Sequence, residues 1–86
     1  GKSLRYSGHA ESPEHSILFG TPDTLDYIEY YFDDDSENTR ASAASTLGRD
    51  KELVAFSELL RRGHAPTRAQ LNAGFDIIEQ AQVLSR

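Results

Sequence analysis

The chain has 86 residues, of which 37% are hydrophobic and 27% charged, with a formal net charge of −5 and no cysteine. This length allows one domain with a modest core, and the composition is that of an ordinary globular protein. No apolar run is long enough for a membrane-spanning helix and no secretory leader is visible, while the lack of cysteine excludes disulfides and thiolate metal sites. We therefore expect a soluble domain, with the reducing cytoplasm as its compartment.

The first 20 residues differ in composition from those that follow. Serine, glycine and proline are frequent in this segment, and its apolar runs, such as residues 17–19, are too short for a helix. We expect residues 1–20 to form an irregular N-terminal arm and residues 21–86 to form a helical domain. A wholly disordered tail is the alternative for residues 1–14.

Residues 21–32 carry the signals of a first helix. Thr21 and Pro22 are typical of a helix N-terminus, where a hydroxyl caps the first turn and proline needs no hydrogen-bond partner. Apolar residues then recur at helical spacing and predict one buried stripe. This stripe is Leu25, Ile28 and Phe32. The tyrosines at positions 27, 30 and 31 would lie on its flanks.

Three more helices are expected. Residues 37–47 form an alanine-rich segment that ends at Gly48, and residues 50–63 combine a strong apolar stripe with acidic residues at the start and arginines at the end. Residues 67–84 begin with a capping box, a hydroxyl at Thr67 and glutamine at Gln70. The fold predicted is therefore all-α, a compact bundle of about four helices with an irregular N-terminal arm. The core is expected to include Phe56, Leu60, Phe75 and Ile78.

Charge is divided unevenly along the chain. Residues 1–39 contain two basic and nine acidic side chains, whereas residues 40–68 contain six basic and three acidic ones. In the first helix the acids alternate with tyrosines, which are frequent in protein interfaces. We interpret this acidic, tyrosine-containing helical face as a binding site for another protein with a basic surface, and we leave homo-oligomer formation open. The alternative is a solvated acidic face that only keeps a small domain soluble. The predicted partner-binding residues are Asp26, Tyr27, Glu29, Tyr30, Asp33 and Asp34.

The segment Arg40-x-x-Ala43-Ala44-x-x-Leu47-Gly48 resembles the first helix of a HEAT-type repeat. The resemblance covers little more than one repeat unit, whereas a solenoid needs about three repeats to close its core. It implies a repeat-like pairing of helices or a fragment of a longer array, with a protein-binding role.

A second pattern, Ala44-x-x-x-Gly48-x-x-x-x-x-Val54, is similar to the spacing of helix-turn-helix proteins, but Arg49 and Ser57 occupy positions that this family fills with apolar residues. The resemblance implies a DNA-binding regulator that uses the basic region 49–68, and this is our alternative function. The net charge of −5 counts against it, because nonspecific affinity for nucleic acid depends on neutralising phosphates.

No catalytic motif is recognisable. The histidines at positions 9, 15 and 64 do not have the helical spacing of a zinc site, and the acids at 33, 35 and 37 match a calcium loop only at its first positions. We expect a non-catalytic adaptor or regulatory domain with no cofactor, no metal ion and no membrane partner, for which nucleic acid is the less favoured alternative.

Overall fold

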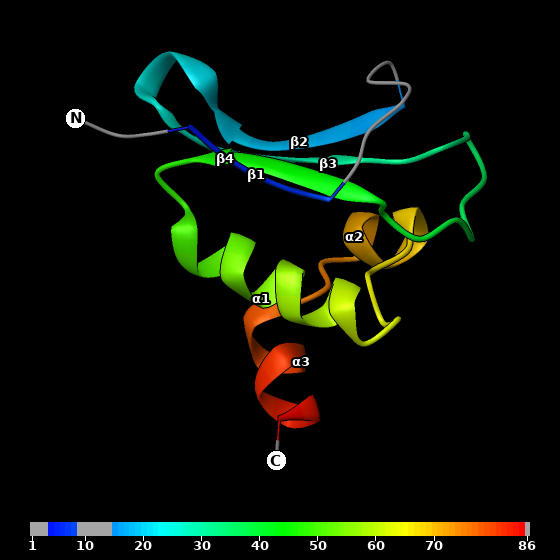
Figure 1. Cartoon of the computed structure of the whole chain (residues 1–86). Coiled ribbons are helices and arrows are strands. Elements are labelled where there is room, and N and C mark those ends of the chain that lie inside the picture. The colour runs from blue at the N-terminus through cyan, green and yellow to red at the C-terminus, as the bar shows by residue number, and fades with distance from the viewer. Residues whose placement is uncertain (1–3, 9–14, 86) are drawn as a thin grey trace.

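The computed structural model describes residues 4–8 and 15–85 and has an α+β fold, in which a four-stranded antiparallel sheet carries helices on one of its faces (Figure 1). The predicted all-α bundle is therefore wrong. In chain order the elements are β1 (Leu4–Gly8), β2 (Ser16–Thr21), the 3₁₀ helix η1 (Pro22–Thr24), β3 (Asp26–Tyr31), β4 (Ala43–Leu47), α1 (Asp50–Arg61), α2 (Arg68–Asn72) and α3 (Ile77–Leu84).

The strand order across the sheet is β1-β4-β3-β2, and every neighbouring pair is antiparallel. Strands β2 and β3 form a hairpin across η1, and β1 joins the far side of β4. The segment that we expected to be an irregular arm therefore provides both edge strands. Residues 1–3 and 9–14 of that segment lie outside the described residues.

Strand β3 replaces most of the predicted first helix, of which only η1 is helical. Every second residue is buried: Ile28, Tyr30 and Phe32. Tyr27 and Glu29, which alternate with them, are only partly buried. This alternation is the period of a half-buried strand, and tyrosine and isoleucine both favour extended backbone.

Strand β4 replaces the predicted second helix. It lies between β1 and β3 in the middle of the sheet, and all residues from Ala43 to Thr46 are buried. Small side chains suit such a central strand, although alanine on its own favours a helix. Ala44 thus belongs to a strand and Gly48 follows it, so both the HEAT-like and the helix-turn-helix interpretations of this segment are wrong.

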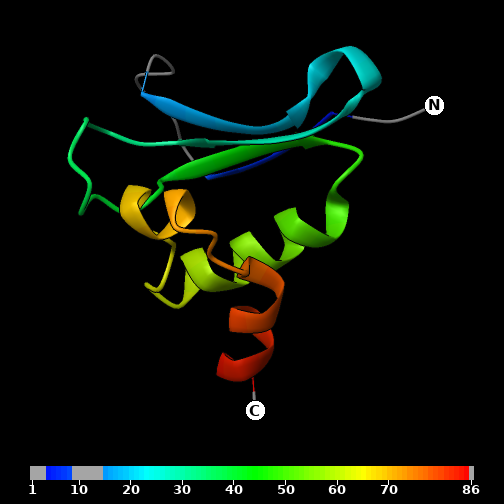
Figure 2. The ribbon, with the colours of Figure 1, turned by 180° about the vertical axis from the view of Figure 1, so that it is seen from behind.

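Helix α1 was predicted correctly and forms the centre of the core. Phe56 and Leu59 are fully buried against the sheet. The Phe56 ring packs edge-on against Tyr30 at 5.5 Å between centroids, and Tyr30 in turn contacts Phe19 at 5.9 Å. Figure 2, the view from behind, shows α1 running across the inner face of the sheet.

The predicted last helix is two helices. Thr67 and Gln70 form the expected capping box at the start of α2, but the chain then turns at Gly74, and Asp76 caps a separate helix α3. Because α3 points away from the sheet and packs on the outer side of α1 (Figure 1), Ile78 is 36% exposed, contrary to our expectation. Within residues 4–8 and 15–85, no helix has the length and apolar character to cross a membrane.

Candidate functional site

The face of the sheet that points away from the helices is the candidate site (Figures 1 and 2). Directly paired residues of antiparallel strands project from the same face, so the strand register identifies its members. Leu18, Glu29 and Ser45 form one row across β2, β3 and β4, and Tyr27 lies next to Leu47 in another. We call the following set the open face: Ser16, Leu18, Tyr27, Glu29, Tyr31, Ser45 and Leu47.

A chain of hydrogen bonds holds Glu29 in place on the open face. The Ser16 hydroxyl donates to Glu29 Oε2 at 2.6 Å, and the Tyr31 hydroxyl donates to Glu29 Oε1 at 3.2 Å. Because the Tyr31 hydroxyl already donates its proton to Glu29, the Ser45 hydroxyl is the donor in the hydrogen bond of 2.8 Å between Ser45 and Tyr31. The carboxylate and the tyrosine are therefore held in place by hydrogen bonds within the domain itself.

The state of Tyr31 follows from this network. Burial is the main cause that raises the pKa of its hydroxyl, the charge of Glu29 acts in the same direction, and the hydrogen bond from Ser45 opposes them. Tyr31 is thus a neutral donor at physiological pH, and Glu29 carries the negative charge of the network.

Apolar contact area adjoins this network. Leu18 is 45% exposed, although it belongs to a strand, and Tyr27 and Leu47 are half-buried beside it. Removing leucine side chains and tyrosine rings from water lowers the free energy, so this part of the open face offers apolar area whose burial would be favourable.

The loop after β3 adds a second acidic region, the acidic loop of Asp33, Asp34 and Asp35. Asp34 accepts hydrogen bonds from the Thr39 hydroxyl and the Ser36 backbone N–H, which lower the pKa of its carboxyl. All three aspartates are exposed. The loop therefore presents fixed negative charge to solvent at the end of β3.

Arg68 attaches the acidic loop to the helices. Its guanidinium lies 4.3 Å above the centre of the Phe32 ring and donates a hydrogen bond of 2.8 Å from Nη2 to the Asp34 carbonyl. This arginine was expected to contribute to a basic surface, but in the structure it supports the base of the acidic loop.

The structure separates the six residues predicted to bind a partner. Tyr27 and Glu29 lie on the open face, and Asp33 and Asp34 lie in the acidic loop. Asp26 belongs to the opposite face and forms an ion pair of 3.1 Å with Arg49 at the start of α1.

Tyr30 cannot contribute, because it is only 2% exposed and its pKa is raised mainly by burial. Tyr31, Leu18 and the two serines of the network were missed. The alternation of Tyr27, Glu29 and Tyr31 along β3 is the signal that could have identified Tyr31.

The polar network of the open face lies apart from the hollows among the helices. It contains a carboxylate and three neutral hydroxyls. Within that part no group of three or more His, Asp or Glu side chains is placed to hold a metal ion. Comparisons with protein-family models, with curated proteins and with solved structures found no match to this chain.

Proposed function

We propose that this domain is a non-catalytic protein-interaction module that binds a basic surface of another protein through its open face and acidic loop. The observation that carries the proposal is the one-sided covering of the sheet: the helices pack on one face, and the other presents tyrosines, an exposed leucine and a fixed carboxylate. The compartment that we propose is the reducing cytoplasm, because the chain has no cysteine.

The two parts of this surface would act differently. Asp33 and its neighbours in the acidic loop would attract a basic partner at a distance and raise the association rate. Tyr27, Tyr31 and Leu18 would supply the contact area that slows dissociation. Glu29 would pair with a lysine or arginine at the centre of the interface, where its fixed position reduces the ordering cost.

A nucleic-acid ligand fits this surface less well. Tyrosines on an open four-stranded sheet are used by some RNA-binding modules to stack bases. Here, however, Glu29 and the aspartates of the acidic loop would repel phosphates.

The basic region 49–68 also gives little support to the DNA-binding alternative. Arg49 is paired with Asp26 and Glu52, and Arg61 and Arg62 are both paired with Glu58. Cations that are already paired contribute less to the neutralisation of phosphates.

The proposal is tested by capture with the immobilised domain, after nuclease treatment of a cell extract, followed by identification of what is retained. We expect a basic protein whose retention is lost with Leu18→Lys, which places a repulsive charge in the contact area. Val83→Asp is the matched control, because it also introduces a charge at an exposed apolar position, but on α3.

Material that is released by nuclease, or that is retained equally by wild type and Leu18→Lys, would contradict the proposal. A second copy of the domain is the other candidate ligand for the open face. Light scattering of the purified domain tests whether the domain associates with itself. Self-association that Leu18→Lys abolishes would assign the open face to a homo-oligomer instead.

A further inference from the structure

The helical side of the molecule has a groove of about 490 Å³ between α1 and α3. Val54 and Ala55 of α1 and Ile78 and Ala81 of α3 form its apolar floor, and Lys51 is among the α1 residues that line it. The groove belongs to elements that take no part in the open face.

Val54 is the unexpected residue of this groove. It lies in the middle of α1, yet 70% of it is exposed, and Ile78 on the other side of the groove is 36% exposed. A β-branched side chain is not favoured in a helix, and an exposed one gains nothing from the core of its own domain. A ligand seated in the groove would remove both Val54 and Ile78 from water.

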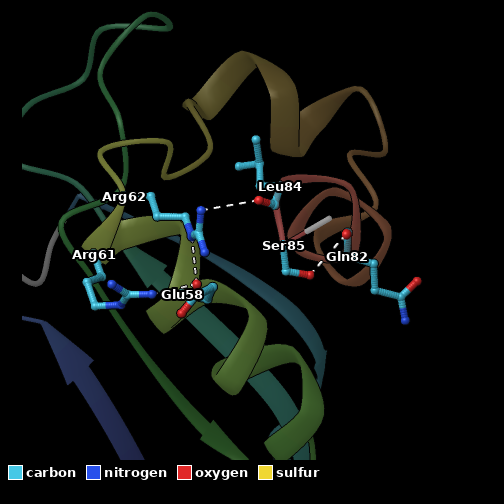
Figure 3. Close-up of polar contacts among 6 residues, drawn as sticks. All are labelled: Glu58, Arg61, Arg62, Gln82, Leu84 and Ser85. Carbon is cyan, nitrogen blue, oxygen red and sulfur yellow. Dashed lines mark hydrogen bonds and ion pairs between the residues drawn. The ribbon is translucent and has the colours of Figure 1, made fainter.

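The charged residues that line the groove are Lys51, Arg61 and Glu58, which sum to +1, and Arg62 beside them shares the single negative charge of Glu58 with Arg61. Lys51 lies in the first turn of α1 and Arg61 in the last, so a cation stands at each end of the α1 wall. Glu58 is the acidic residue of the lining, and it is already bound: Arg61 Nη2 and Arg62 Nε each donate to its Oε1 at 2.6 Å (Figure 3). These hydrogen bonds hold the pKa of Glu58 at about 2, so the Glu58 carboxylate remains ionised and paired with both arginines at physiological pH.

The groove is also held in shape at one end. Arg62 extends from the end of α1 and donates a hydrogen bond of 3.2 Å from Nη1 to the carbonyl of Leu84 at the end of α3 (Figure 3). The distance between the two helices is thereby set at this end, and a preformed groove loses less entropy when it binds a ligand.

We propose that this groove docks an amphipathic helix of a partner protein, with apolar side chains on Val54 and Ile78 and carboxylates near Lys51 and Arg61. A helix is the fitting occupant, because an apolar groove with charged ends matches a helix with an apolar stripe and flanking charges. The required charge is opposite to that of the partner of the open face. The domain would thus have two docking surfaces of opposite polarity and could hold two proteins together.

The test uses two synthetic peptides of about 16 residues, long enough for a helix in a bound state. Both carry leucine at helical spacing, and the remaining positions are mainly glutamate in one peptide and mainly lysine in the other. In titrations followed by ¹⁵N–¹H spectra of the domain, we expect the glutamate peptide to bind at least about tenfold more tightly and to shift resonances of α1 and α3.

Two variants test the contacts separately. Val54→Asp should weaken binding of the glutamate peptide by about tenfold or more, and Lys51→Glu should weaken it by several-fold. Both positions are exposed, so neither change should alter the fold. Val83→Asp, also on an exposed apolar residue but outside the groove lining, is the matched control and should bind like the wild type.

Equal affinity for both peptides, an unchanged affinity of Val54→Asp, or shifts confined to the sheet would overturn the proposal. Sedimentation with phosphatidylserine vesicles separates a membrane from a protein ligand: Val54-dependent binding to vesicles without binding of the glutamate peptide would also overturn it. Leu18→Lys should not affect the peptide, so failure here is distinct from failure of the open-face proposal.

Discussion

At the scale of single residues, two glycines show how the same backbone conformation has different costs in different surroundings. Gly20 in β2 and Gly63 after α1 have φ of +96° and +76°. A Cβ on Gly20 would lie 2.3 Å from the carbonyl oxygen of Asp26 and 2.9 Å from the Cα of Tyr27, whereas a Cβ on Gly63 would meet nothing within 4 Å. Gly20 therefore allows β2 and β3 to approach closely beside η1.

We predict that Gly20→Ala lowers the free energy of unfolding by at least about 3 kcal/mol, because backbone strain adds to a clash with backbone atoms that cannot move aside. Gly63→Ala should cost about 1 kcal/mol, the strain alone. Urea denaturation of both variants measures the difference. Similar losses for the two glycines would show that β2 and β3 have room to separate at this point.

At the scale of elements, the end of α1 is organised by one carboxylate. Glu58 binds Arg61 and Arg62 on the next turn, and Arg62 continues to α3. The two arginine hydrogen bonds lower the pKa of Glu58 from 4.5 to about 2. In the unfolded chain, Glu58 takes up its proton near the ordinary value, so between these pH limits the unfolded state binds more protons than the folded one.

The stability that Glu58 contributes should therefore be present above about pH 4.5 and be lost as the pH falls towards 2. Glu58→Gln should make the melting temperature less sensitive to pH within this interval, although the effect is small because water screens the exposed pair. Thermal melts at several pH values between about 5 and 2.5 measure how the melting temperature depends on pH. In this interval Glu58 takes up its proton in the unfolded state before it does so in the folded state. Glu79→Gln, which removes one exposed carboxylate of α3, is the matched control for the loss of a surface charge.

At the scale of the whole molecule, negative charge is concentrated in the part of the chain that forms the sheet: residues 1–49 carry nine acidic and four basic side chains, whereas residues 50–86 carry five of each. The open face and the acidic loop carry carboxylates, whereas Lys51 and Arg61 lie along the groove on the helical side. Such a separation gives the domain an orientation when it approaches a charged partner. It also allows the two proposed docking surfaces to be occupied by proteins that do not compete for the same charges.

For the basic partner captured through the open face, we predict that Asp33→Lys slows association several-fold and weakens its dependence on salt, with little change in the dissociation rate. Asp33 is chosen because Asp34 holds the loop through Thr39 and Ser36. Glu79→Lys changes the net charge by the same amount on α3. If surface plasmon resonance finds equal effects for the two variants, net charge alone, rather than the acidic loop, steers the partner.

The sequence alone determined the central helix and the start of α2. In α1 the apolar residues recur at a spacing that no strand can bury on one face. At the start of α2, Thr67 and Gln70 form a capping box within four residues. These signals are local, so no contact with a distant segment was needed to make them correct. The acidic and aromatic character of the region around Tyr27 and Glu29 could be read in the same way.

Only the tertiary structure decided that residues 26–31 and 43–47 are strands. Ile28 and Phe32 fit a helical stripe with Leu25 and equally fit a strand with Tyr30, so the local pattern does not distinguish the two. Whether these segments become helix or strand depends on pairing between distant residues, such as Leu4 with Leu47. The backbone hydrogen bonds between paired strands override the helical preference of the alanines in β4. For the same reason Tyr30 was placed on the surface and Tyr31 was missed: the strand period of two, set by the sheet, decides which tyrosine is buried.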